Sequence, residues 1–163
     1  MTEQEFQQRF SIALNPQQQA AVRQTEGPVL LLAVPGSGKT TVIVNRIANI
    51  IKFGNAYESD YVPENIGDTD YEILKAYLDS GDEFLKESAD AICATRHAAP
   101  WSVLAITFTN KAAEQMRERI ATMLPDGRAR WIRMGTFHSV FSRILRENAE
   151  RIGFTDSYTI YEP

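Results

Sequence analysis

The chain has 163 residues, of which 44% are apolar and 23% are charged, and this is the size and composition of one ordinary globular domain. No apolar run approaches the roughly 20 residues that a membrane-spanning helix needs, and the N-terminal MTEQEFQQRF lacks the pattern of a secretory signal. Cys93 is the only cysteine, which excludes an intrachain disulfide and a cysteine-based metal cage. We therefore expect a cytoplasmic protein that does not bind a membrane.

The net charge of -4 would argue against a nucleic-acid partner if the charge were spread evenly along the chain, but it is not. Residues 54–99 contain eleven acidic and three basic side chains, a net charge of -8, so the rest of the chain carries -4 minus -8, or +4. The acidity therefore belongs to one segment, and a DNA-binding face elsewhere is not excluded.

The first predicted element is a helix that begins near Pro16. Asn15 is a good N-cap, Pro16 suits the first helical position, and Gln18 stands where a capping box places its glutamine. A Gly-Pro pair at 27–28 ends this segment. The continuously apolar run 29–33 then predicts a strand that is buried on both faces, as in a parallel sheet.

A second helix is predicted from about Gly38 to Gly54, after a short loop. Its apolar side consists of Val42, Val44, Ile47, Ile50 and Ile51. Residues 54–99 then interrupt the alternation of strands and helices. Their spaced apolar side chains predict one or two helices inserted at the edge of the sheet, with His97 exposed to solvent.

Strands and helices alternate again after residue 102. The run 103–108 predicts a strand, 110–124 an amphipathic helix and 131–135 a weaker strand. A further helix ends at Gly153, and residues 158–161 predict another strand. The apolar positions of these two helices are Ala112, Ala113, Met116, Ile120 and Leu124 in the first, and Phe137, Val140, Phe141, Ile144, Leu145 and Ile152 in the second. This order predicts an α/β fold, a three-layer parallel sheet with flanking helices.

The segment from Ala33 to Thr40, Ala-Val-Pro-Gly-Ser-Gly-Lys-Thr, has the pattern of a P-loop between a predicted strand and a predicted helix. Its glycines allow backbone N–H groups to turn toward phosphate oxygens, and the helix N-terminus adds positive charge at the same point. Lys39 is expected to reach the β- and γ-phosphates of ATP and Thr40 to ligate Mg²⁺. The nucleotide-binding residues predicted in and beside this loop are Ala33, Pro35, Gly36, Ser37, Gly38, Lys39, Thr40 and Thr41.

The structural alternative is a glycine-rich turn that binds nothing, and the adjacent Lys-Thr pair disfavours it. P-loops occur in kinases, GTPases, transporters and motors, so other segments decide between these classes.

Three further segments resemble motifs of UvrD/Rep-type superfamily 1 helicases, in that family's order. Residues 14–22, Leu-Asn-Pro-Gln-Gln-Gln-Ala-Ala-Val, are similar to the Q motif, and residues 105–116, Ala-Ile-Thr-Phe-Thr-Asn-Lys-Ala-Ala-Glu-Gln-Met, to motif Ia. Residues 135–139, Gly-Thr-Phe-His-Ser, resemble motif Ib. The resemblance implies the N-terminal part of a RecA-like motor domain that spans residues 1–163 and carries the insertion at 54–99.

The resemblance gives these segments expected roles. Gln18 would hydrogen-bond adenine, which an amide can do as donor and acceptor together. Phe108 would stack on a base of single-stranded DNA, as the sequence-tolerant stacking platforms of such proteins do. Phe137 is expected to be a core anchor. The remaining predicted DNA contacts are Thr107, Thr109, Asn110, Thr136, His138 and Ser139.

Each of these segments also has a structural alternative. Gln18 could be a surface residue of an ordinary helix, and Phe108 could belong to the core with Asn110 as a helix cap. His138 could be a catalytic base, but no serine, cysteine or acid is placed to form a triad with it.

The resemblance implies an ATP-dependent DNA helicase of 3′→5′ polarity that needs ATP and Mg²⁺ and acts on single-stranded and duplex DNA. DNA repair, replication restart and recombination stay open as its pathway. The family's Walker B acids, arginine finger and second motor domain have no counterpart here, so we expect a fragment that is inactive alone and partners the C-terminal motor domains of its own chain. The unpaired sheet edge of such a fragment would favour self-association.

Two other classes of protein remain as alternatives. A different P-loop enzyme, such as a small-molecule kinase, predicts turnover without stimulation by DNA. A non-catalytic ATP-dependent DNA-binding module predicts DNA affinity that changes with nucleotide but no hydrolysis.

Overall fold

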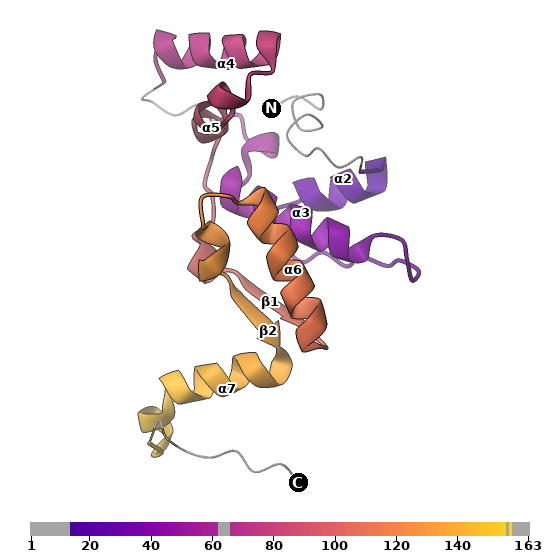
Figure 1. The fold of residues 1–163 in the computed structure, drawn as a ribbon, viewed down its shortest axis with the longest axis vertical. Helices are drawn as coiled ribbons and strands as arrows, with labels where there is room; N and C mark the ends of the chain where they lie inside the picture. Colours follow the sequence, from indigo (N-terminus) through magenta and orange to yellow (C-terminus); the bar gives the residue numbers. More distant parts are fainter. Residues whose placement is uncertain (1–13, 62–65, 156, 158–163) are drawn as a thin grey trace. The chain divides into compact units, whose positions relative to one another are not determined.

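The computed structural model describes residues 14–61, 66–155 and 157 (Figure 1). The chain divides into two compact units, residues 1–99 and residues 100–163, which we describe in turn. The first unit is helical and the second contains a small parallel sheet, so the α/β class that the sequence predicts is confirmed. Within the described ranges, no helix has both the length and the apolar character needed to cross a membrane.

The first unit is built on the contact between α2 (Pro16–Arg23) and α3 (Lys39–Lys52). The predicted capping box of α2 is present, because Asn15 Oδ1 accepts from Gln18 N–H at 2.9 Å and Gln18 Oε1 accepts from Asn15 N–H at 3.0 Å. The apolar side predicted for α3 is buried except at Ile50, which is half-buried. Both helices are therefore where the sequence predicts them.

The strand predicted at residues 29–33 is wrong for this structure. The segment forms no strand, and the side chains of Leu30 and Leu32 are each 82% exposed. A strand buried on both faces needs neighbouring strands for its backbone groups and a helix layer on each face. In the described part of the chain the sheet has two strands, which pair with each other and not with residues 29–33.

The predicted insertion contains two helices, α4 (Asp68–Ser80) and α5 (Glu83–Ile92), which pack against each other. A short 3₁₀ helix, η1 (Ala56–Glu58), precedes them. Gly54 and Thr95 form a parallel bridge, and Ala98 N–H donates to the Ile50 carbonyl at 2.9 Å. The two ends of the excursion are thus joined at the C-terminal end of α3. His97 is exposed, as predicted.

The second unit is a strand–helix–strand arrangement followed by a helix. It consists of η2 (Pro100–Ser102), β1 (Leu104–Thr107), α6 (Asn110–Met123), η3 (Arg128–Trp131), β2 (Arg133–Thr136), α7 (Phe137–Glu147) and η4 (Ala149–Ile152). Strands β1 and β2 are parallel, and Thr107 at the end of one is in register with Thr136 at the end of the other. Residues Ala113, Met116, Ile120 and Leu124 of the predicted apolar face of α6 are buried, and Ala112 is half-buried.

The predicted apolar stripe of α7 is largely uncovered. Val140 is buried, whereas Phe137, Phe141 and Leu145 are 46–50% exposed, and Ile152 in η4 is 55% exposed. The core-anchor role predicted for Phe137 is therefore wrong. Val140 is thus the residue of this stripe that is fully buried in a unit whose described sheet has two strands. The strand predicted at 158–161 lies outside the described residues.

Candidate nucleotide and DNA sites

The P-loop segment folds into a turn that ends at the N-terminus of α3. Ser37 N–H donates to the Val34 carbonyl at 3.3 Å across Pro35 and Gly36, and Gly36 has a positive φ of 82°. Proline at the second position and glycine with positive φ at the third are the residues that a type II turn requires. Gly38, with φ of 86°, is the N-cap of α3. The loop thus leads directly to the positive end of a 14-residue helix.

The Lys39 side chain turns back over this loop. Its Nζ donates to the backbone carbonyls of Ala33, at 2.9 Å, and Val34, at 2.7 Å, while the Ser37 hydroxyl also donates to Val34 at 2.7 Å. The ammonium therefore lies at the mouth of the loop, and the Thr40 side chain beside it is exposed. This cation, the helix N-terminus and the free space around Gly36 fit a phosphate group.

Gln18 joins α2 to the P-loop. Its Nε2 donates to the Ser37 carbonyl at 3.0 Å, while its Oε1 completes the capping box. A Cβ at Gly38 would lie 2.9 Å from the same Nε2 atom, so an alanine at this position would require the Gln18 amide to shift. The structure therefore brings Gln18, Ser37 and Gly38 together, three residues that the sequence assigns to the nucleotide.

Arg46 holds the other end of α2 against α3, a contact that no sequence pattern indicates. Its Nη1 donates to the carbonyl of Ala21 at 2.7 Å and also to the carbonyl of Gln24. Burial lowers the pKa of the Arg46 guanidinium. A cation at the C-terminus of a helix interacts favourably with its dipole. Contacts at both ends of α2 thus fix Gln18 relative to the loop.

The predicted DNA contacts lie at two strand-to-helix junctions in the second unit. Thr109 caps α6 by accepting from Ala112 N–H at 3.1 Å, and Thr136 caps α7 by accepting from Ser139 N–H at 3.3 Å. The Ser139 hydroxyl donates to the Thr136 carbonyl at 3.0 Å, and Thr107 donates to the Thr109 carbonyl at 2.8 Å. Because β1 and β2 are parallel and in register, these two junctions lie side by side.

Phe108 projects from the first junction. Its side chain is 92% exposed, so the alternative that it belongs to the core is wrong. Asn110 is the first residue of α6 and Thr109 is the cap, so the alternative role of Asn110 as the cap is wrong as well. Phe137 lies 6.3 Å from Phe108 between ring centroids, and Phe141 stacks on Phe137 at 6.1 Å. An exposed row of three rings therefore begins at Phe108.

The remaining junction residues, Asn110 and His138, are exposed. The nucleotide residues belong to the first unit and these DNA residues to the second.

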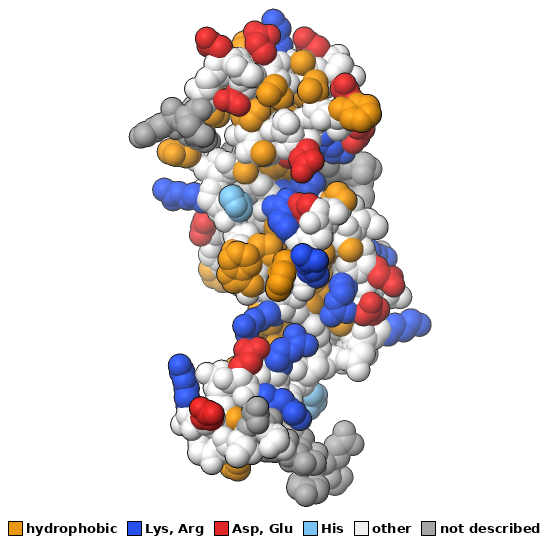
Figure 2. Space-filling model, turned by 60° about the vertical axis from the view of Figure 1, so that its left-hand side comes forward, with side chains coloured by type: hydrophobic (Ala, Val, Ile, Leu, Met, Phe, Trp, Pro, Cys, Tyr) orange, Lys and Arg blue, Asp and Glu red, His pale blue; other side chains and the backbone are white. Residues whose placement is uncertain are grey.

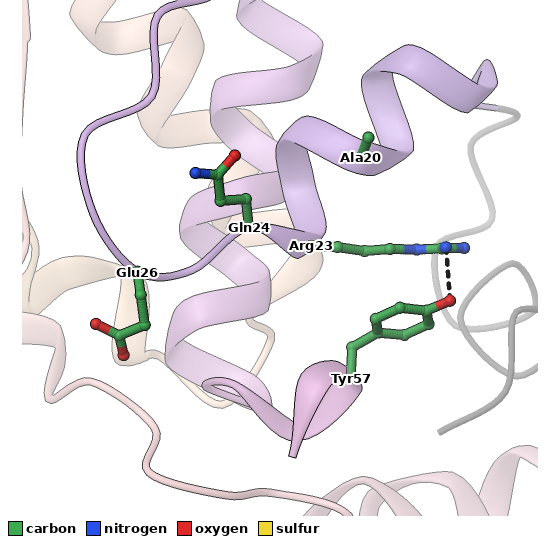
Figure 3. A pocket seen from close by; sticks show the side chains of 5 residues that line it. All are labelled: Ala20, Arg23, Gln24, Glu26 and Tyr57. Atoms are coloured by element: carbon green, nitrogen blue, oxygen red, sulfur yellow. Dashed lines mark hydrogen bonds between the residues drawn. The ribbon is translucent and has the colours of Figure 1, made fainter.

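A separate hollow lies at the C-terminal end of α2 (Figure 3). It is lined by Ala20, Arg23, Gln24, Glu26 and Tyr57. Arg23 Nη1 donates to Tyr57 Oη at 2.6 Å, and the guanidinium lies 4.0 Å from the centre of the Tyr57 ring. This contact ties α2 to η1. The lining contains none of the residues that the sequence assigns to the nucleotide.

The sequence profile of the "UvrD/REP helicase N-terminal domain" matches residues 14–62 and 85–163 of this chain. The chain belongs to this family. All of the predicted nucleotide and DNA residues fall inside the matched ranges, whereas residues 63–84, within the insertion, fall outside them.

Known relatives agree with this assignment to the UvrD/REP family. The chain is 38% identical over 149 residues to the ATP-dependent DNA helicase PcrA of Bacillus subtilis (strain 168). The matched part covers 91% of this chain and 14% of that relative. The chain is 36% identical over 149 residues to PcrA of Leuconostoc citreum and 37% identical over 150 residues to PcrA of Staphylococcus aureus (strain Mu50 / ATCC 700699). The matched part covers 14% and 15% of these two relatives and 91% and 92% of this chain.

Proposed function

We propose that this chain is the nucleotide-binding part of an ATP-dependent DNA helicase that moves 3′→5′ along single-stranded DNA and opens duplexes. The observation that carries the proposal is the P-loop at the N-terminus of α3, with Lys39 at its mouth and Gln18 tied to it. The names of the PcrA relatives support the helicase activity, and the motif resemblance supports the polarity. We also propose that the two units are parts of one RecA-like, three-layer domain.

In this proposal the loop residues hold ATP and Mg²⁺. Lys39 exchanges its two carbonyl partners for β- and γ-phosphate oxygens, which form stronger, charge-assisted hydrogen bonds. The Thr40 hydroxyl ligates Mg²⁺, and the flanking positions Ala33, Pro35 and Thr41 line the site. Gln18 contacts the adenine, so the residue that holds the P-loop through the Ser37 carbonyl also contacts the base.

The second unit supplies the proposed contact with DNA. Phe108 stacks on a base, and the capped N-termini of α6 and α7 face the backbone phosphates through Thr107, Thr109, Asn110, Thr136, His138 and Ser139. Stacking on an exposed ring does not depend on base identity, which suits a protein that moves along any sequence. The exposure of Phe108 supports this role over a core role.

The test is ATP hydrolysis by the intact protein that contains this chain, measured with and without single-stranded DNA. Lys39→Ala is the variant, and Lys75→Ala, on the exposed surface of α4, is its matched control. We expect strong stimulation by DNA that Lys39→Ala abolishes and Lys75→Ala retains. Hydrolysis that is indifferent to DNA would remove the helicase proposal and keep the P-loop. Equal binding of Mg·ATP by Lys39→Ala and the wild type would overturn the P-loop assignment itself.

A further inference from the structure

The helical pair formed by α4 and α5, residues 68–92, has no role in the proposed motor, and we refer to it as the acidic hairpin. Residues 63–84 lie outside the family profile, although the segments on either side match it. Helix α4 and the first two residues of α5 are therefore outside the part that the profile matches, whereas residues 85–92 of α5 are inside it.

The acidic hairpin is built as an ordered element. Gly54 and Thr95 bridge at its base, and a Cβ at Gly54 would lie 2.0 Å from the Thr95 carbonyl oxygen, so this approach requires glycine. Each helix begins at a cap, since Asp70 accepts from Gly67 N–H at 2.9 Å and Asp82 from Phe84 N–H at 2.9 Å. The bridge joins the two ends of the segment, the caps begin each helix, and α4 packs against α5.

Large apolar side chains are exposed on both helices of the hairpin. Phe84 is 93% exposed, Tyr71 is 63% exposed and Leu78 is 47% exposed. Tyr71 and Leu78 are seven residues apart and lie on one face of α4. Figure 2 shows hydrophobic side chains gathered over this part of the molecule with acidic side chains around them. Exposed aromatic residues inside a polar rim are typical of sites that bind another protein.

The net charge of the hairpin indicates the charge that a protein bound to it would carry. Residues 68–92 contain eight acidic side chains and two lysines, a net charge of 2 minus 8, or -6. Glu83 forms an ion pair with Lys86 at 3.1 Å, and Asp90 forms one with Lys52 at 3.6 Å. These two ion pairs neutralise two of the eight carboxylates, so the hairpin keeps an excess of negative charge. Such a surface repels nucleic acid and anionic lipid and attracts a basic surface.

We propose that the acidic hairpin is a docking surface for a partner protein that presents a basic, amphipathic helix. The apolar side of that helix packs against Phe84, Tyr71 and Leu78, and its lysine or arginine side chains face the surrounding carboxylates. The partner is recruited beside the motor without use of the P-loop or the Phe108 junction. This inference does not depend on the proposed helicase activity, because Tyr71, Leu78 and Phe84 lie outside the matched ranges and belong to neither the proposed nucleotide site nor the proposed DNA site.

The probe is a fluorescent helical peptide of about 18 residues, with lysines on one face and leucines on the other. Its binding to the full 163-residue chain is followed by fluorescence anisotropy at low and high salt. We expect saturable binding that weakens with salt and is absent when glutamates replace the lysines of the peptide. Phe84→Ala should weaken it by about fivefold to thirtyfold, the loss expected when an interface side chain that contributes about 1–2 kcal/mol is truncated.

A matched aromatic variant separates docking from general charge attraction. Trp101 is 66% exposed and lies outside the hairpin, so Trp101→Ala should leave peptide affinity unchanged. The pair Glu72→Gln and Asp79→Asn should reduce both the affinity and its salt dependence. The proposal is overturned if the wild type does not bind, if Phe84→Ala and Trp101→Ala behave alike, or if the carboxylate variants have no effect. Phe84 and Trp101 are both exposed, so neither variant should change the thermal unfolding midpoint.

Discussion

The Nε2 atom of Gln18 donates a hydrogen bond of 3.0 Å to the backbone carbonyl of Ser37, nineteen residues further along the chain. The Oε1 atom of the same amide accepts from Asn15 N–H and completes the capping box of α2. One side chain therefore both begins a helix and fixes the phosphate loop. A change at Gln18 should alter helix stability and loop geometry together.

Gln18→Ala should weaken the binding of Mg·ATP more than that of Mg·tripolyphosphate. The variant removes the proposed contact with adenine and the tether to Ser37, and each hydrogen bond contributes about 0.5–1.5 kcal/mol. Titration with a fluorescent ATP analogue, competed by each ligand, measures both affinities. Gln17→Ala is the control, because Gln17 is exposed on the same helix. An equal loss for the two ligands would assign Gln18 to the loop alone.

Gly38→Ala should destabilise the first unit more than Gly27→Ala does. Both glycines have positive φ, 86° and 72°, so each variant has the conformational cost of about 1–2 kcal/mol for a left-handed residue. A Cβ at Gly38 would also displace Gln18 Nε2, 2.9 Å away, whereas the space around Gly27 is open. Urea unfolding followed by circular dichroism measures the free energy of unfolding of each variant. We expect the two values to differ by about 1 kcal/mol, the contribution of the one hydrogen bond that Gly38→Ala removes.

The excess cost of Gly38→Ala should disappear when Gln18 is already alanine. Double-mutant cycles isolate such a coupling when the two residues are in contact. An excess that persists in the Gln18→Ala background would show that the glycine is required for a reason other than this contact.

Helices α2, α3 and α6 were predictable because their signals are local. Caps such as Asn15 and the spacing of Val42, Ile47 and Ile120 are properties of neighbouring residues, and each helix satisfies its own backbone hydrogen bonds. The exposure of Phe108 followed from the motif resemblance rather than from pattern, since an apolar residue after a strand otherwise indicates a core position.

The segment 29–33 and the stripe of α7 were not predictable in the same way. A strand depends on partners that are distant in sequence, and an apolar run does not show whether they are present. The pattern of α7 identifies which of its sides is apolar. It does not show how much surface covers Phe137 and Phe141, which are 48% and 50% exposed. The contact between Arg46 and the end of α2 left no trace in the sequence, because arginines on helices are common.

Arg46→Met should lower the free energy of unfolding of the first unit by about 1.5–3 kcal/mol, the range for hydrogen bonds made by a charged group. Methionine keeps much of the apolar stem but cannot donate to the carbonyls of Ala21 and Gln24. Arg46→Lys should recover part of the loss, because an ammonium keeps the charge without the planar fork. Lys75→Met, on the exposed side of α4, should have little effect in the same urea titration.

Phe108→Ala should reduce affinity for single-stranded DNA by about 1–3 kcal/mol, or roughly fivefold to 150-fold, without lowering stability. The ring is 92% exposed, so its removal leaves no cavity, and the proposed stacking with a base is what the variant loses. Trp101→Ala in the same unit is the matched control, since Trp101 is also an exposed aromatic residue but lies before β1. The affinity of the intact protein is measured with a fluorescent oligonucleotide of mixed sequence, and the loss should be similar for different sequences because every base can stack. If the two variants bind DNA equally well, Phe108 is not the stacking platform, and the row formed with Phe137 and Phe141 serves another contact.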